Sequence, residues 1–241
     1  MRPTIVLIHG AFAESASWDG VIDPLVAEGH RVVAAANPLR GLAGDAAAVS
    51  DLVRTIDGPV VLVAHSYGGA VMSNVDADAG EIVGLVYANA FAPDAGENCF
   101  QLAAMYPGSR LGEQTARPVP RSDGTTDLYI ASDSFHDIFC QDVPAKQAAL
   151  MCATQRPATQ EALVEPTGDH PLWETVPSWF LIGEEDRIIP PELQRYTADR
   201  ARRAYVQRVT AVPGASHAMP VSRPDATVHP ILEAAAMCVA A

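Results

Sequence analysis

The chain has 241 residues, of which 49% are hydrophobic and 19% are charged, a size and balance typical of one large α/β domain. Its net charge of −13 would repel a phosphate backbone or an anionic bilayer, so no nucleic acid and no membrane is expected as a partner. The sequence shows neither a basic leader nor an apolar stretch of membrane-spanning length. These features predict a cytoplasmic protein that acts on a small neutral or cationic molecule.

Six apolar runs of strand length alternate with helical patterns along the chain. The predicted strands are Thr4–His9, Arg31–Ala35, Val60–Ala64, Val83–Ala88, Trp179–Ile182 and Tyr205–Ala211. A helical pattern at Trp18–Glu28 joins the first two strands, and a second one at Asp45–Ile56 precedes the third. This order predicts an α/β fold with a mostly parallel six-stranded sheet, flanked by helices on both faces.

The alternation of strand and helix breaks between residues 92 and 176, where Pro, Gly, Asp and Gln separate short segments. A stretch of this length exceeds an ordinary loop, so it should contain helices of its own. They are expected at Cys99–Met105, Ser134–Phe139, Pro144–Ala153 and Thr159–Glu165. We therefore predict a helical cap at residues 92–176, inserted into a single catalytic domain. The core of that domain is residues 1–91 and 177–241, and Pro224–Val239 is its closing helix.

The four cysteines are Cys99, Cys140, Cys152 and Cys238. They form no C-x-x-C pair and no Cys/His spacing typical of metal ligands, so no metal site is predicted. Reduced, mostly buried thiols are expected, and a disulfide would be an option only in an exported protein.

The strongest chemical signal is an apolar strand that runs into a turn of small residues and then into a helical pattern, at Val60–Ala70. This context is typical of a nucleophile elbow, whose strained turn would lift the hydroxyl of Ser66 clear of the sheet. The positions two before and two after the serine must be small, and they hold Ala64 and Gly68. Ala64 replaces the first glycine of the usual G-x-S-x-G pattern. Ser66 is predicted as the nucleophile, the alternative being an incidental serine in a glycine-rich turn.

A serine hydroxyl needs a base to accept its proton, and imidazole has a suitable pKa. His217 follows the last predicted strand, where a fold with this elbow places its histidine, so it is predicted as the general base. His9 and His65 are expected to support loops instead.

A carboxylate should fix the tautomer of the histidine and stabilise its protonated form. Asp186 follows the fifth predicted strand with room for a turn after Gly183, and it is the predicted acid. Asp94 is the alternative, because some proteins of this fold carry the acid after the preceding strand.

The tetrahedral intermediate of acyl transfer also needs two donors for its oxyanion, usually backbone N–H groups. One is expected at Tyr67, directly after the nucleophile. The other is expected at Ala11 in the turn that follows the first strand, with Phe12 as the alternative. The side chains expected to line a substrate pocket are Phe12, Phe135, Phe139 and Trp173.

Several of these motifs together resemble the α/β-hydrolase superfamily across nearly the whole chain. They are Ile8–Ala11, His65–Gly69, Gly183–Asp186 and Ser216–His217. Tyr87–Pro93 and Ser216–Pro220 are similar, more narrowly, to the branch of plant methyl esterases, hydroxynitrile lyases and bacterial carboxylesterases. The resemblance implies a helical cap and no cofactor. Hydroxynitrile lyases of this branch carry a lysine after the histidine and a threonine after the first strand, and Ala218 and Gly10 stand at those places here.

The predicted function is that of a carboxylesterase-like serine hydrolase. It would cleave a small-molecule ester, thioester or lactone through an acyl-enzyme. The alternatives are a small-molecule receptor of the same fold and, less favoured, an enzyme like the hydroxynitrile lyases. A homodimer is left open.

Overall fold

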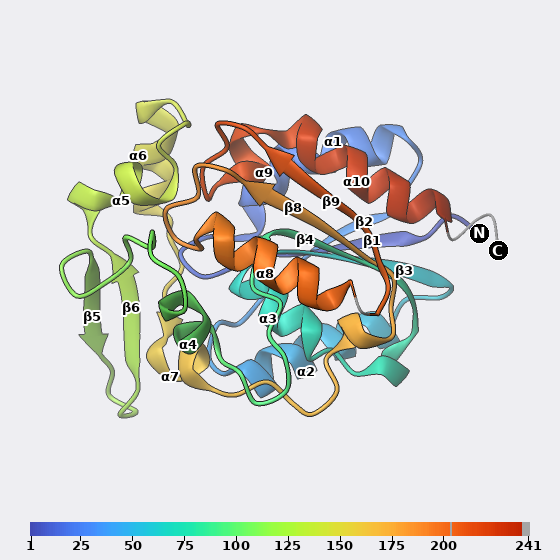
Figure 1. Cartoon of the computed structure of the whole chain (residues 1–241), viewed down its shortest axis with the longest axis horizontal. Coiled ribbons are helices and arrows are strands. Elements are labelled where there is room, and N and C mark those ends of the chain that lie inside the picture. Colours follow the sequence, from blue (N-terminus) through green and yellow to red (C-terminus); the bar gives the residue numbers. More distant parts are fainter. Residues whose placement is uncertain (203, 238–241) are drawn as a thin grey trace.

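The computed structural model describes residues 1–202 and 204–237. At its centre is a six-stranded sheet in the order β2-β1-β3-β4-β8-β9, in which all neighbouring strands run parallel (Figure 1). The strands are β1 (Thr4–Ile8), β2 (Val32–Ala35), β3 (Pro59–Ser66), β4 (Glu81–Ala90), β8 (Ser178–Gly183) and β9 (Val206–Val212). The predicted α/β fold with a parallel six-stranded sheet is therefore confirmed.

Helices cover both faces of this sheet (Figure 1). One face carries α1 (Asp19–Ala27), α9 (Met219–Ser222) and α10 (Pro224–Met237), and the other carries α2 (Leu42–Arg54), α3 (Tyr67–Ser73) and α8 (Pro191–Ala201). Alternate residues of β3 pack into the cores on opposite faces of the sheet. Leu62 lies in one core and Val61 in the other, and both are fully buried. Burial on both sides explains why this strand is a continuous apolar run.

The segment between β4 and β8 contains helices close to the predicted ranges. They are α4 (Cys99–Ala104), α5 (Ser132–Phe139), α6 (Ala145–Ala153) and α7 (Gln160–Val164). It also contains a three-stranded antiparallel sheet that the sequence analysis did not predict, formed by β5 (Ala116–Pro120), β6 (Thr126–Ile130) and β7 (Ala158–Thr159). Two prolines and mostly exposed side chains in β5 leave no alternation of apolar and polar residues to indicate a strand. The expectation of helices alone in this segment was incomplete.

The remaining elements are short 3-10 helices at Ser15–Trp18, Ala77–Ala79 and Leu172–Glu174. Cys99 and Cys140 are buried free thiols, and Cys152 is half-buried. Cys238 and the predicted helix end at Val239 lie outside the described residues. None of the helices in the described part of the chain is long and apolar enough to cross a membrane.

Candidate active site

Ser66 is the last residue of β3, and α3 begins at the next residue. Its backbone has φ 57° and ψ −128°, a left-handed conformation that an L-residue adopts only when the surrounding structure enforces it. The enforcing contacts come from neighbouring strands, since a Cβ on Gly68 would lie 2.5 Å from the carbonyl oxygen of Ile8. A Cβ on Gly69 would collide with the carbonyl of Phe91. The two glycines therefore let α3 pack against the ends of β1 and β4, and this packing fixes the turn at Ser66.

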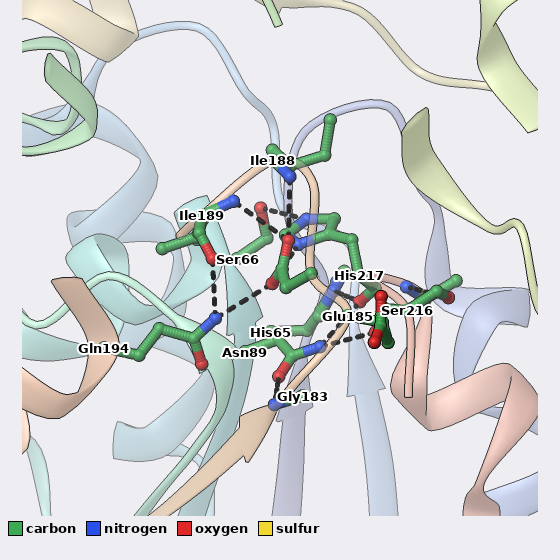
Figure 2. Close-up of polar contacts among 12 residues, drawn as sticks. His65, Ser66, Asn89, Gly183, Glu185, Ile188, Ile189, Gln194, Ser216 and His217 are labelled. Carbon is green, nitrogen blue, oxygen red and sulfur yellow. Dashed lines mark hydrogen bonds and ion pairs between the residues drawn. The ribbon is translucent and has the colours of Figure 1, made fainter. Parts of the chain in front are cut away.

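The structure brings Ser66, His217 and Asp186, here called the triad, into one hydrogen-bonded chain. Figure 2 labels Ser66 and His217. The distance from Ser66 Oγ to His217 Nε2 is 2.9 Å, and the distance from His217 Nδ1 to Asp186 Oδ2 is also 2.9 Å. With Asp186 ionised, Nδ1 of the neutral imidazole donates to the carboxylate and Nε2 accepts from the serine hydroxyl. This is the arrangement in which imidazole can accept a proton from serine.

Asp186 is buried, and each of its carboxylate oxygens accepts two hydrogen bonds. Oδ1 accepts from the backbone N–H groups of Ile188 and Ile189 at 2.8 and 2.9 Å. Oδ2 accepts from His217 and from Gln194 Nε2 on α8, the latter at 2.9 Å. Hydrogen bonds of this kind compensate the cost of burying a carboxylate and hold it in a single orientation. Sequence reasoning did not identify Gln194.

The loop of His217 is held by two buried side chains from the neighbouring strands. His65, next to Ser66 on β3, has its Nε2 2.8 Å from the carbonyl oxygen of His217. Because a carbonyl can only accept, Nε2 carries the proton and donates it. Burial lowers the pKa of His65 well below its ordinary value, which keeps this ring neutral. Asn89, at the end of β4, donates to the carbonyl of Ser216 at 2.7 Å. The supporting position of His65 is as expected, whereas Asn89 carried no predicted role.

The turn after β1 lies directly against the serine. A Cβ on Gly10 would lie 3.0 Å from Ser66 Oγ and 2.8 Å from the carbonyl oxygen of His65, so only glycine fits there. The N–H of Phe12 donates to the carbonyl of Arg156, between β6 and β7, at 2.8 Å. This bond occupies the donor of Phe12 and favours Ala11 as the second oxyanion donor, beside Tyr67.

Tyr67 also anchors the start of α3. Its hydroxyl donates to Asp45 Oδ2 on α2 at 2.8 Å, and both groups are buried. Burial raises the pKa of Asp45 and that of the Tyr67 phenol. The ring is thus fixed on the α2 side, and Tyr67 can offer only its backbone N–H to an oxyanion at Ser66.

Of the predicted pocket aromatics, Phe139 is in contact with the triad. Its ring lies edge-on to that of His217, with centroids 5.0 Å apart, and Phe135 stacks behind it at 4.9 Å. Trp173 lies in a different environment, where its indole N–H donates to the carbonyl of Pro93 at 2.8 Å and Arg200 lies over its ring. Neither of these contacts of Trp173 involves the triad, and its place in the substrate pocket stays a prediction.

Phe12, in the turn after β1, lines a cavity of about 210 Å³. This cavity lies between the segment after β1 and α6, and its lining residues include Phe12, Met151 and Val221. A larger hollow of about 400 Å³, bordered by α2 and by Pro166 and Gly168, contains none of the triad residues. Within the described part of the chain, no group of three or more His, Cys, Asp or Glu residues is placed to hold a metal ion.

Comparison with known proteins shows the family of this chain. The sequence model of the alpha/beta hydrolase family matches residues 5–229. The chain belongs to the α/β-hydrolase family. It is 26% identical over 258 residues to the "Alpha/beta hydrolase nvfD" of Aspergillus novofumigatus, covering 98% of this chain and 97% of that protein. It is 33% identical over 110 residues to a "Carbendazim hydrolyzing esterase" of a Nocardioides species, covering 40% and 46% of the two chains.

Among solved structures, polyneuridine aldehyde esterase superimposes on this α/β-hydrolase with a TM-score of 0.78 at 18% identity, covering 97% of this chain and 99% of the other. At this identity the likeness concerns the fold. Ser66, Asp186 and His217 lie at or just beyond the carboxyl ends of parallel strands, where open α/β sheets bind their ligands. Asp94, the alternative acid, faces Arg200 at 3.9 Å and makes no hydrogen bond to His217.

Proposed function

We propose that this α/β-hydrolase is a serine hydrolase that cleaves a small-molecule carboxylic ester, thioester or lactone. The observation that carries the proposal is the chain of two 2.9 Å hydrogen bonds from Ser66 through His217 to Asp186. The relatives named as esterases support the same reaction class.

The proposed reaction begins when Ser66 Oγ attacks the substrate carbonyl while His217 Nε2 takes the hydroxyl proton. The N–H groups of Ala11 and Tyr67 would donate to the oxyanion that forms. Collapse of this intermediate expels the alcohol, which receives its proton from His217, and leaves an acyl-serine. Water, deprotonated by the same histidine, then hydrolyses the acyl-enzyme and restores the serine. This route uses only side chains, backbone donors and water, in keeping with the prediction of no cofactor.

The proposed substrate is compact. Ser66 is only 4% exposed and His217 is fully buried, with Phe139 against the imidazole. An acyl group that reaches Ser66 must therefore fit among close-packed side chains, which favours short acyl or aryl esters over long lipids.

A turnover assay with p-nitrophenyl esters of graded chain length tests the proposal. We expect hydrolysis that is fastest for short acyl chains, labelling by a fluorophosphonate probe, and loss of both in Ser66→Ala. Removal of a serine nucleophile typically lowers kcat by about 10⁶-fold, so the variant should fall to background. Wild-type protein that hydrolyses none of the esters and resists the probe would refute the proposed function.

A further inference from the structure

Asn89 has an unusual backbone at the carboxyl end of β4. Along the β3–β4 pairing, His65 pairs with Ala88 but Ser66 pairs with Ala90, so Asn89 is an extra residue in a β-bulge beside the nucleophile. Its φ is 46°, in the left-handed region, and its side chain is fully buried. Bulges of this kind redirect a side chain, and here the bulge directs the Asn89 amide toward the loops that follow β8 and β9 (Figure 2).

The Asn89 amide joins these two loops through hydrogen bonds at both of its ends. Its Nδ2 donates to the carbonyl of Ser216 at 2.7 Å and lies 3.3 Å from that of His217. Its Oδ1 accepts from the N–H of Gly183, the last residue of β8, at 2.5 Å. A Cβ on Gly183 would lie 2.7 Å from Nδ2 and 2.9 Å from Oδ1. The amide therefore fills the space that the glycine leaves open.

Each end of the Asn89 amide bonds to backbone groups of the segment that carries one member of the triad. Gly183 accepts a hydrogen bond from the N–H of Asp186 at 3.2 Å, so its position sets the turn that carries the acid. At the other end, the carbonyls of Ser216 and His217 belong to the loop that carries the base. The bond between His217 Nδ1 and Asp186 Oδ2 spans the same two loops, so its length depends on how far apart they are held.

We propose that Asn89 is a positioning residue for the triad, whose amide fixes the separation between the Asp186 turn and the His217 loop. The inference rests on the proposed function. An amide suits this place because it can donate at one end and accept at the other. A carboxylate at this place has no N–H to donate and would set an oxygen against the carbonyl oxygens of Ser216 and His217.

The variant Asn89→Asp tests this role with almost no change in shape. It keeps the acceptor for Gly183 and replaces the donor by an oxygen, so the His217 loop should move away. A displacement of about 1 Å can cost roughly 100-fold in rate. We expect kcat to fall 10- to 100-fold on this scale, with KM within twofold of wild type. Asn74→Asp is the matched control, because Asn74 also joins two backbone groups through its amide, Ala70 and Gly168, each at 2.8 Å. The kcat of Asn74→Asp should stay within twofold of the wild-type value.

A second pair of variants separates positioning from general loss of structure. In an Asp186→Asn background the acid–base hydrogen bond is already compromised, so adding Asn89→Asp should lower kcat by less than threefold. An equal loss in both backgrounds would overturn the proposal, as would a kcat within twofold of wild type for folded Asn89→Asp. If circular dichroism shows that Asn89→Asp does not fold, Asn89→Gly carries the same expectations, because glycine accepts the left-handed backbone and removes the amide.

An NMR measurement tests Asn89 without turnover. The His217 Nδ1 proton bonded to Asp186 should give a downfield imidazole resonance in the wild type and in Asn74→Asp. It should be lost or shifted in Asn89→Asp, and an unchanged resonance would overturn the proposal. If the wild type hydrolyses no ester, the proposed function fails and this resonance still decides the role of Asn89.

Discussion

The loops after β4 and β8 begin side by side, on strands that pair with each other, and each carries an aspartate that could orient a histidine. The carboxylate of Asp186 is enclosed and accepts bonds from Ile188, Ile189, Gln194 and His217. That of Asp94 is 39% exposed, bonds to the N–H of Ala95 and lies 3.9 Å from Arg200. Chain order leaves both aspartates eligible, whereas burial among hydrogen-bond donors favours Asp186 as the proposed acid.

Strand β4 itself contributes a different group to the same region. The neutral amide of its Asn89 bonds to the loop of His217 and to Gly183 at the end of β8. A second buried carboxylate at that place would face the charge of Asp186 and destabilise it. The loop after β8 therefore carries the proposed acid, and the neighbouring strand β4 carries the uncharged side chain proposed to hold the Asp186 turn and the His217 loop together.

Among variants that compare the loops after β4 and β8, Asp186→Asn is expected to lower kcat the most. An amide cannot accept bonds from all four donors, so it would favour the wrong tautomer of His217. We expect kcat to fall about 10³- to 10⁴-fold, as when a triad aspartate is replaced by asparagine in a serine protease. Steady-state kinetics with a p-nitrophenyl ester, read against the Ser66→Ala background, measures the loss. Near wild-type turnover would assign the acid to another residue.

A smaller loss of kcat is expected when the hydrogen bond from Gln194 to Asp186 is removed. Gln194→Leu deletes one donor to Asp186 and preserves most of the buried volume. It also removes Gln194 Oε1, a buried acceptor that has no hydrogen-bond partner, so the melting temperature should change little. We expect kcat to fall about tenfold, which corresponds to roughly 1.4 kcal/mol. Gln101→Leu makes the same change at an exposed position and should leave kcat unaltered, whereas equal losses in the two variants would contradict this role.

The smallest loss of kcat is expected from Asp94→Asn, in the loop after β4. Asp94→Asn alters a half-exposed carboxylate whose contact with Arg200 is long, and such pairs contribute about 0–1 kcal/mol to the free energy of unfolding. Turnover should stay within twofold of wild type, and denaturant unfolding should shift by less than about 1 kcal/mol. A loss of turnover comparable to that of Asp186→Asn would show that the two acids act together.

The sequence predicted the sheet well because its strands are buried on both faces and appear as continuous apolar runs, Val60–Ala64 most clearly. It also placed Ser66, Asp186 and His217 in the loops that the structure brings together. The hairpin of β5 and β6 was missed because its exposed residues and prolines carry no apolar pattern. The contacts of Trp173 with Pro93 and Arg200 could not be predicted, because these two residues are remote from it in the sequence.

The sequence by itself predicted the parallel sheet, the turn of small residues around Ser66 and the order of the proposed nucleophile, acid and base, since these follow from apolar runs and from small residues at fixed spacing. Only the tertiary structure supports the choice of Asp186 over Asp94 as the proposed acid and of Ala11 over Phe12 as the proposed oxyanion donor, and shows which side chains support the triad. Those choices depend on hydrogen bonds between segments far apart in the chain, such as Asn89 to Ser216 and Phe12 to Arg156. Local pattern does not encode such distances, because they are set when the strands and loops pack together.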